Sequence, residues 1–266
     1  NKKSILEAIE ENEVVEVKQT LNGKWSAGPS IAPVYFNGMG EGSPINSILA
    51  SNSKTGSVTM SYGITVAYEI SKKLSLRSGI HKVDYGYDTN DVSFTSSFNA
   101  STGNQISNID YSNDSQSIIL NNPNNENVIP KPGSVFAMDV TGKNPTRLGT
   151  MGQQMGYLEV PLELNYALLN RKFGVNIIGG VSSLFLTDNS VVLESSGQTT
   201  EFGEANNINS VNFSTNLGLG LDYKFTPKLK FNVEPVFKYQ LNTFSNTSGN
   251  FNPYSLGVYS GFTFKF

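Results

Sequence analysis

The 266-residue sequence has no cysteine and one histidine, His81. The lack of cysteine excludes a disulfide framework, a thiol nucleophile and a thiolate metal site, and one histidine cannot form a multi-histidine metal site. Long hydrophobic runs are also missing, because no stretch approaches the roughly 18 apolar residues of a membrane-spanning helix. Charged residues make up 15% of the chain, the net charge is −3 and no basic stripe occurs. We therefore do not expect nucleic acid as a partner.

Hydrophobic residues recur instead at every second position, beginning near Trp25 and continuing to the end of the chain. The apolar parity of segment 58–70 consists of Val58, Met60, Tyr62, Ile64, Val66, Tyr68 and Ile70. The other parity is small or polar, and the same division returns in 211–225 and 229–241, where only Thr215 and Val236 break it. A period of two predicts β-strands with one apolar face.

Eight segments show this pattern: about 24–36, 57–70, 74–87, 154–168, 173–186, 210–225, 228–243 and 252–266. Each could cross a membrane as a tilted strand, which takes roughly 9–11 residues. Tight turns at 71–73, 170–172 and 226–227 alternate with longer connections. The sequence predicts an all-β protein, an eight-stranded antiparallel up-and-down transmembrane β-barrel with long extracellular loops and both termini in the periplasm.

The pattern alone does not say which face is inside, and a soluble sandwich would bury the apolar parity. A narrow eight-stranded barrel accommodates small and polar side chains in its interior, whereas the large aliphatic set fits outside. Such a barrel has a low average hydropathy, here −0.24, although its lipid face is apolar. Aromatic residues near the expected strand ends predict two interfacial girdles: Trp25, Tyr35, Tyr62, Tyr68, Phe173, Phe185, Phe213, Tyr223, Phe225, Tyr254, Phe262, Phe264 and Phe266.

Two parts of the chain depart from this pattern. Residues 1–23 carry spaced charges and are expected to be a periplasmic linker or a short helix, ahead of the barrel at 24–266. The longest connection, about 88–153, is rich in Asn, Ser, Asp and Gly and is expected to be a flexible extracellular loop. Short strands within it are expected at 117–120 and 134–140.

Several ionisable residues lie on the polar, inward parity. We expect a structural charge network in the lumen, formed by Glu69, Arg77, Glu159, Glu163, Glu234 and Lys238, because charges shielded from lipid must pair or meet water. Asp222, Lys224 and Lys230 share this face. The alternative is an ion path or gate. Glu159 and Glu163 would suit acid–base hydrolysis, but four residues apart on one strand they indicate no cleft, and His81 is expected to be a polar barrel residue.

No other motif predicts a catalytic, cofactor-binding or metal-binding residue. The glycine-rich run 38–42 precedes no helix and lacks the Lys-Ser/Thr of a phosphate-binding loop. Asp110, Asp114 and Asp188 are isolated acidic residues that do not complete a calcium-binding loop. The sequence therefore predicts a protein that is not an enzyme and has no cofactor.

Segments 156–164, 76–80 and 261–266 resemble the outer-membrane β-barrel family of Bacteroidetes-type bacteria, and the last looks like the C-terminal signal that directs barrel assembly. Segments 32–36, 60–63 and 238–244 are similar to the C-terminal barrel of dual-membrane-spanning anti-sigma factors. The resemblance implies a cell-envelope signalling protein whose cytoplasmic and inner-membrane parts precede this barrel.

Two functions follow as hypotheses. The first is an outer-membrane anchor and sensor that signals through its N-terminal segment. The second is a small accessory barrel that docks to a larger outer-membrane complex. Outer-membrane lipids, including lipopolysaccharide, are the expected surroundings, and other outer-membrane proteins are candidate partners. A pore or a lipid-acting enzyme is a third possibility, which conductance measurements would test.

Overall fold

A computed structural model describes residues 23–96, 106–113, 115, 118–121 and 147–266. The elements in chain order are β1(Trp25–Met39), β2(Gly42–Ser43), the 3₁₀ turn η1(Ser47–Leu49), β3(Lys54–Glu69), β4(Leu74–Ser96), β5(Ile109–Tyr111), β6(Ile118–Leu120), β7(Arg147–Asn170), β8(Phe173–Ser195), β9(Gln198–Ala205), β10(Val211–Lys224), β11(Leu229–Gln240), β12(Ser248–Gly249) and β13(Asn252–Lys265). Within these residues, no helix is long and apolar enough to cross a membrane.

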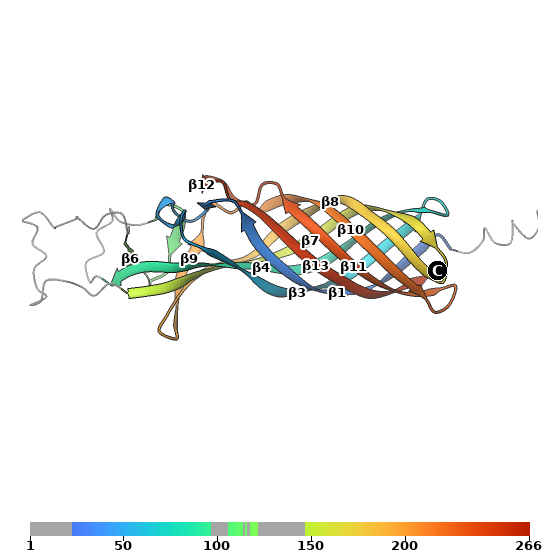
Figure 1. Ribbon diagram of the computed structural model, residues 1–266, viewed down its shortest axis with the longest axis horizontal. Helices are drawn as coiled ribbons and strands as arrows, with labels where there is room; N and C mark the ends of the chain where they lie inside the picture. The colour runs from blue at the N-terminus through green and yellow to red at the C-terminus, as the bar shows by residue number, and fades with distance from the viewer. Residues whose placement is uncertain (1–22, 97–105, 114, 116–117, 122–146) are drawn as a thin grey trace, which may run out of the picture.

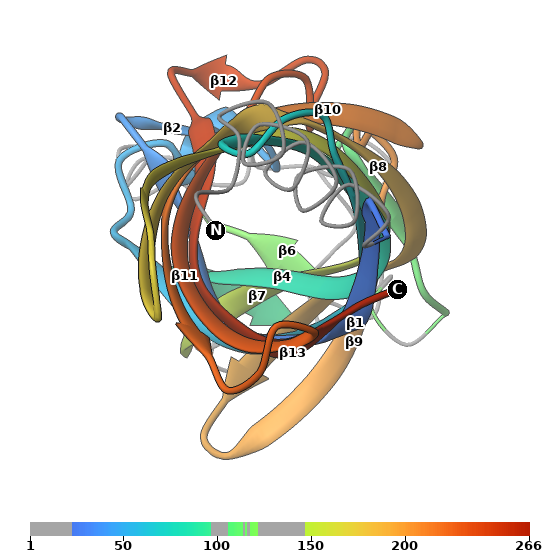
Figure 2. The same cartoon turned by 90° about the vertical axis from the view of Figure 1, so that its right-hand side faces the viewer.

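Eight of these strands form a closed antiparallel ring in the order β1-β3-β4-β7-β8-β10-β11-β13 (Figures 1 and 2). Pairing of β13 with β1 closes the ring, with Leu256 opposite Tyr35 and Lys265 opposite Ser26. Closure leaves the ring without an unpaired strand edge. The predicted eight-stranded up-and-down barrel is confirmed.

The apolar parity faces outward and the polar parity faces the lumen. In β10 the exposed positions are Val211, Phe213, Thr215, Leu217, Leu219 and Leu221, and every residue between them is buried. Burial of Asn212, Ser214 and Asn216 beside exposed leucines is the reverse of a soluble core. The aliphatic residues of this strand therefore face the lipid, as in a membrane barrel.

Three tight turns join strands at one end of the barrel, which we call the turn end. Side-chain hydroxyls stabilise two of them: Ser71 accepts a hydrogen bond from the backbone N–H of Leu74, and Thr226 from that of Leu229. The ring also closes here, since the backbone N–H of Phe266 donates to the carbonyl oxygen of Trp25 at 3.0 Å. Both ends of the barrel sequence therefore lie at the turn end.

At the opposite loop end, three strands continue beyond the ring (Figure 1). β4, β7 and β8 have 23, 24 and 23 residues. The extension of β4 pairs with β6 and that of β8 with β9, and β9 in turn pairs with β5. This loop-end sheet has its own hydrophobic core: Ile45, Leu49, Val92, Phe94, Ile106, Ile109, Met151, Val191, Leu193, Phe202 and Ala205.

The loop-end sheet corrects the expected loop limits. Residues 88–96 and 147–153 belong to β4 and β7, and 187–195 belongs to β8, because the pairing of β7 with both neighbours continues there, with a register shift against β4 between Thr89 and Val92. The expected short strand at 117–120 is confirmed as β6. The expectations for 134–140 and for residues 1–22 lie outside the described residues.

Aromatic side chains surround the turn end. Trp25 packs on Tyr68, with ring centroids 4.9 Å apart, and Tyr223 packs on both Phe173 and Phe225 at the same spacing. At the loop end, Tyr254 lies 6.3 Å from Tyr35 and 5.9 Å from Phe237 between ring centroids. Tyr62 differs from the expected girdle position, since it pairs with Ile31 and Lys82 near the middle of the barrel.

Candidate functional site

The lumen contains three carboxylate–cation clusters at different heights, and two of them centre on β4, β7 and β11. Arg77 on β4 donates to both oxygens of Glu234 on β11 at 2.7 and 2.8 Å, and to Glu163 on β7 at 3.1 Å. Asn216 donates to the second oxygen of Glu163 at 3.0 Å, and Asn232 donates to Glu234 at 3.2 Å. One guanidinium thus binds two carboxylates across the barrel in the charge-assisted geometry that favours arginine.

The second cluster lies farther from the turn end. Nζ of Lys238 lies 2.5 and 2.7 Å from the two carboxylate oxygens of Glu159, and both side chains are almost fully buried. The same ammonium lies 4.8 Å from the ring centroid of Tyr259. His81 stands beside Glu159 in the strand register and contacts the hydroxyl of Thr65 through Nε2 at 3.2 Å. Both charged side chains of this second cluster therefore have a polar or aromatic neighbour.

The third cluster lies at the turn end. Lys265 donates to Glu69 at 2.5 Å, and Lys230 lies 3.4 Å from Asp222, which also accepts a hydrogen bond from Asn176 at 2.7 Å. All six residues of the expected lumen network thus form ion pairs. Their structural role stays a prediction, because ion pairs in a lumen could also belong to a gate.

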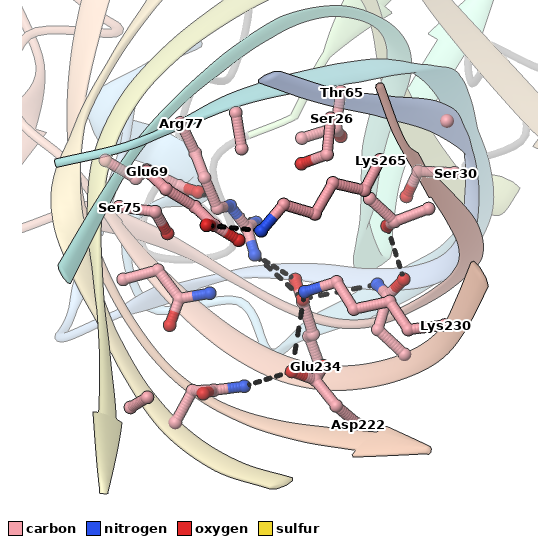
Figure 3. Close-up of a pocket in the computed structure, with 18 of the residues that line it drawn as sticks. Ser26, Ser30, Thr65, Glu69, Ser75, Arg77, Asp222, Lys230, Glu234 and Lys265 are labelled. Carbon is pink, nitrogen blue, oxygen red and sulfur yellow. Dashed lines mark hydrogen bonds and ion pairs between the residues drawn. The ribbon is translucent and has the colours of Figure 1, made fainter. Parts of the chain in front are cut away.

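A cavity of about 1020 Å³ occupies the turn-end half of the lumen. We call it the vestibule. Figure 3 shows Arg77, Lys230 and Lys265 projecting into it from different strands. The turn residues Lys72, Lys73 and those of 226–228 are also part of its wall. Its size is at the upper limit of ordinary ligand pockets.

The loop-end half of the lumen is filled. Phe36 stacks on Tyr85 with ring centroids 4.7 Å apart, Tyr85 lies 5.8 Å from Tyr157, and Tyr87 lies 5.1 Å from Phe251. All five side chains are buried, and Tyr87 donates to Gln153 at 2.5 Å. We call these five residues the aromatic layer. It separates the vestibule from the loop end.

The aromatic layer was not predicted from the sequence, although a signal for it was present. Val83, Tyr85 and Tyr87 have the same parity as Arg77 and His81 on β4. A strand that is uninterrupted from 74 to 96 must point all of them into the lumen. Because the strand was expected to end at residue 87, the two tyrosines were expected at the rim of the barrel. Large side chains at the rim would not have to fit inside the lumen.

The structure also places the residues considered for chemistry. Glu159 and Glu163 belong to different ion pairs, with Lys238 and Arg77, so they do not form a carboxylate pair facing a common cleft. Asp110 accepts a hydrogen bond from Asn206, and Asp188 from the backbone of Asn189. Within the described residues, no group of three His, Cys, Asp or Glu side chains is placed to hold a metal ion; Asp114 lies outside those residues.

The closed ring, its outward apolar face and its polar lumen define a transmembrane β-barrel. Residues 18–246 match the family model described as outer membrane protein beta-barrel domain. This chain therefore belongs to that family of outer-membrane proteins. No curated protein matches the sequence.

Solved structures of similar fold include Neisserial surface protein A, which is 10% identical, with 91% of this chain and 97% of that chain covered and a TM-score of 0.42. OprG from Pseudomonas aeruginosa is 13% identical, with 92% and 96% covered and a TM-score of 0.43. The outer membrane protease OmpT from Escherichia coli is 9% identical, with 91% and 96% covered and a TM-score of 0.36. Similarity this low assigns no activity or ligand to this chain.

Proposed function

We propose that this barrel is a closed, non-enzymatic anchor and sensor in the outer membrane. The observation that carries the proposal is the aromatic layer, whose buried rings fill the lumen between the vestibule and the loop end. A narrow barrel filled by side chains has no continuous aqueous path. The polar clusters below the layer then hold the strands together and conduct no ions.

The orientation follows from the asymmetry of the connections. Short turns on the periplasmic side and longer loops outside are the usual arrangement in outer-membrane barrels. In this orientation the loop-end sheet faces the outside, among lipopolysaccharide headgroups, and the vestibule opens to the periplasm. Both ends of the barrel sequence are then periplasmic.

The sensor part of the proposal rests on the resemblance to dual-membrane-spanning anti-sigma factors. The loop-end sheet has a separate core and lies where an external stimulus would first act. The segment before Trp25 begins at the opposite end, where it would transmit the signal toward the cell interior. The strands of the ring connect the two ends directly, since β4, β7 and β8 run through both the barrel and the loop-end sheet.

A second candidate function is an accessory barrel in a larger outer-membrane complex. It is favoured by the size of the loop-end sheet, which offers a folded surface to another protein rather than only short loops. Purification from native membranes distinguishes the two functions. Recovery of a longer form of this chain with a sigma factor supports signalling, whereas a short form recovered with other barrels supports the accessory function.

Conductance measurements test whether the lumen of the barrel is closed. The intact protein in planar bilayers should produce no channel events. Replacing both Tyr85 and Tyr157 by Ala removes two rings from the aromatic layer and should introduce measurable conductance. The matched control replaces Phe237 and Phe262, which are exposed on the outer face, and should leave the barrel non-conducting. Stable channel events from the unmodified protein would contradict the proposal.

A further inference from the structure

The wall of the vestibule has a charge opposite in sign to that of the whole chain. Nine Lys and Arg side chains and four Asp and Glu side chains line it, whereas the complete chain has a formal charge of −3. Glu159 pairs with Lys238 behind the wall, and including this carboxylate still leaves an excess of four positive charges. A cleft lined by one sign of charge concentrates the field and attracts ligands of the other sign.

The cations without carboxylate partners gather at the rim. Deep in the vestibule, Arg77 is neutralised by Glu163 and Glu234. Among the residues that the structure describes, five of the lysines that line the vestibule have no carboxylate oxygen within 4.0 Å: Lys24, Lys72, Lys73, Lys224 and Lys228. Lys224 donates to the side-chain oxygen of Asn170 instead. The five come from the start of β1, from the turns β3–β4 and β10–β11 and from the end of β10, so a ligand at the centre of the opening meets positive charge from several sides.

The sequence next to this rim supplies the complementary charge. Residues 7–16 contain five glutamates and no Lys or Arg: Glu7, Glu10, Glu11, Glu13 and Glu16. This acidic segment joins the barrel through Lys24, which itself lines the vestibule. Glu16 is seven residues from Gly23, and seven residues reach roughly 24 Å when extended. The connection is therefore long enough to bring the glutamates to the rim lysines.

We propose that the vestibule is a binding site for an acidic peptide segment and that residues 7–16 of this chain are its occupant. Covalent connection gives such a segment an effective concentration in the millimolar range, so several weak Lys–Glu contacts are enough to hold it. Binding would depend strongly on salt, because the charges at the rim are exposed. The proposal concerns this chain alone and does not require the signalling function.

Cysteine cross-linking in the full chain tests the proposal, because the absence of native cysteine makes each introduced thiol unique. One variant combines Val14→Cys with Ser75→Cys, whose side chain lines the vestibule. The matched control combines Val14→Cys with Leu76→Cys, which is the next residue of β4 and is exposed on the outer face. Both proteins are reconstituted in zwitterionic vesicles, treated with a short bismaleimide and analysed by mass spectrometry.

We expect a cross-link between positions 14 and 75 that is several-fold more abundant than that between 14 and 76. Raising the salt from about 0.01 M to 1 M shortens the Debye length from roughly 30 to 3 Å and should reduce the cross-link several-fold. Replacing the five glutamates by Gln should reduce it similarly, as should Lys72→Gln, Lys73→Gln and Lys228→Gln together. Lys82→Gln, which removes a lysine paired with Asp84 away from the vestibule, should leave it unchanged.

Equal cross-linking to positions 75 and 76 would overturn the proposal, since the segment would then have no preference for the vestibule. A cross-link that survives both high salt and the five Glu→Gln changes would also overturn it, because binding would not depend on charge. Heat-modifiable migration on gels confirms that each variant still forms the barrel, so a lost cross-link is not caused by a lost fold.

Discussion

Replacing Glu159 by Gln leaves the Lys238 ammonium without its carboxylate in the interior of the barrel. The exposed fractions of the two side chains are 0% and 5%, and both carboxylate oxygens lie within 2.7 Å of Nζ. Removing one partner of a buried pair costs about 3–5 kcal/mol, because the remaining charge is desolvated without compensation. We therefore expect Glu159→Gln to reduce the free energy of unfolding by this amount.

The measurement is urea unfolding in phospholipid vesicles, followed through Trp25, the only tryptophan. The control is Lys82→Gln, because Lys82 and Asp84 are about half exposed and 3.8 Å apart, and an exposed pair contributes about 0–1 kcal/mol. Glu159→Leu combined with Lys238→Met removes both charges and should cost less than Glu159→Gln alone. A loss below about 1 kcal/mol for Glu159→Gln would contradict this prediction, as would a double variant whose cost equals the sum of its single variants.

Further predictions concern the loop-end sheet. Gly203 has φ +141, and a Cβ there would lie 2.1 Å from the carbonyl oxygen of Asp110. Gly203→Val should therefore separate β5 from β9 and speed amide hydrogen exchange in these two strands. Gly179→Ala is the control and should have no such effect, because the space around Gly179 is open. Phe202 is fully buried in the hydrophobic core of the loop-end sheet, and Phe202→Ala should destabilise this sheet by about 3–5 kcal/mol. Limited proteolysis should then cut the loop-end sheet while the barrel stays intact. Unchanged resistance of the sheet to protease would contradict this prediction. Burial, with a smaller contribution from Glu194, raises the pKa of Asp88 above its usual 3.8. The stability gained by protonating Asp88 is complete below pH 3.8 and is lost as the pH rises through the raised pKa, so Asp88→Asn should slow hydrogen exchange in the loop-end sheet at pH 7 and have little effect at pH 3.5.

Much of the charge network could be predicted because side-chain direction in a strand follows from position alone. The inward parity of β4 and β7 places Arg77, Glu159 and Glu163 in the lumen once the strands are recognised. The pairing of Arg77 with Glu234 could not be predicted in this way, because the two residues are 157 positions apart. It depends on the barrel being narrow enough for a guanidinium on β4 to reach β11.

Strand length was the main error, and it had a physical cause. Polar residues such as Asp88, Thr89 and Asn90 predict a loop when only local pattern is considered. In the structure Asp88 and Thr89 pair with both β3 and β7, and the backbone N–H of Asn90 donates to the carbonyl oxygen of Ser53 at 2.9 Å. Cross-strand pairing outweighs weak β-propensity. The loop-end sheet and its second core were missed for the same reason.

The class of protein follows from local properties of the chain, because eight alternating segments, three short turns and a polar interior parity are sufficient for a membrane barrel. The contents of the lumen depend instead on the folded barrel. Closing the ring brings side chains from distant strands to the same height, so that ion pairs form in the middle, aromatic rings fill the loop-end half and lysines from separate turns surround one opening. These features depend on which strands face each other across the barrel, and that information is absent from any single segment.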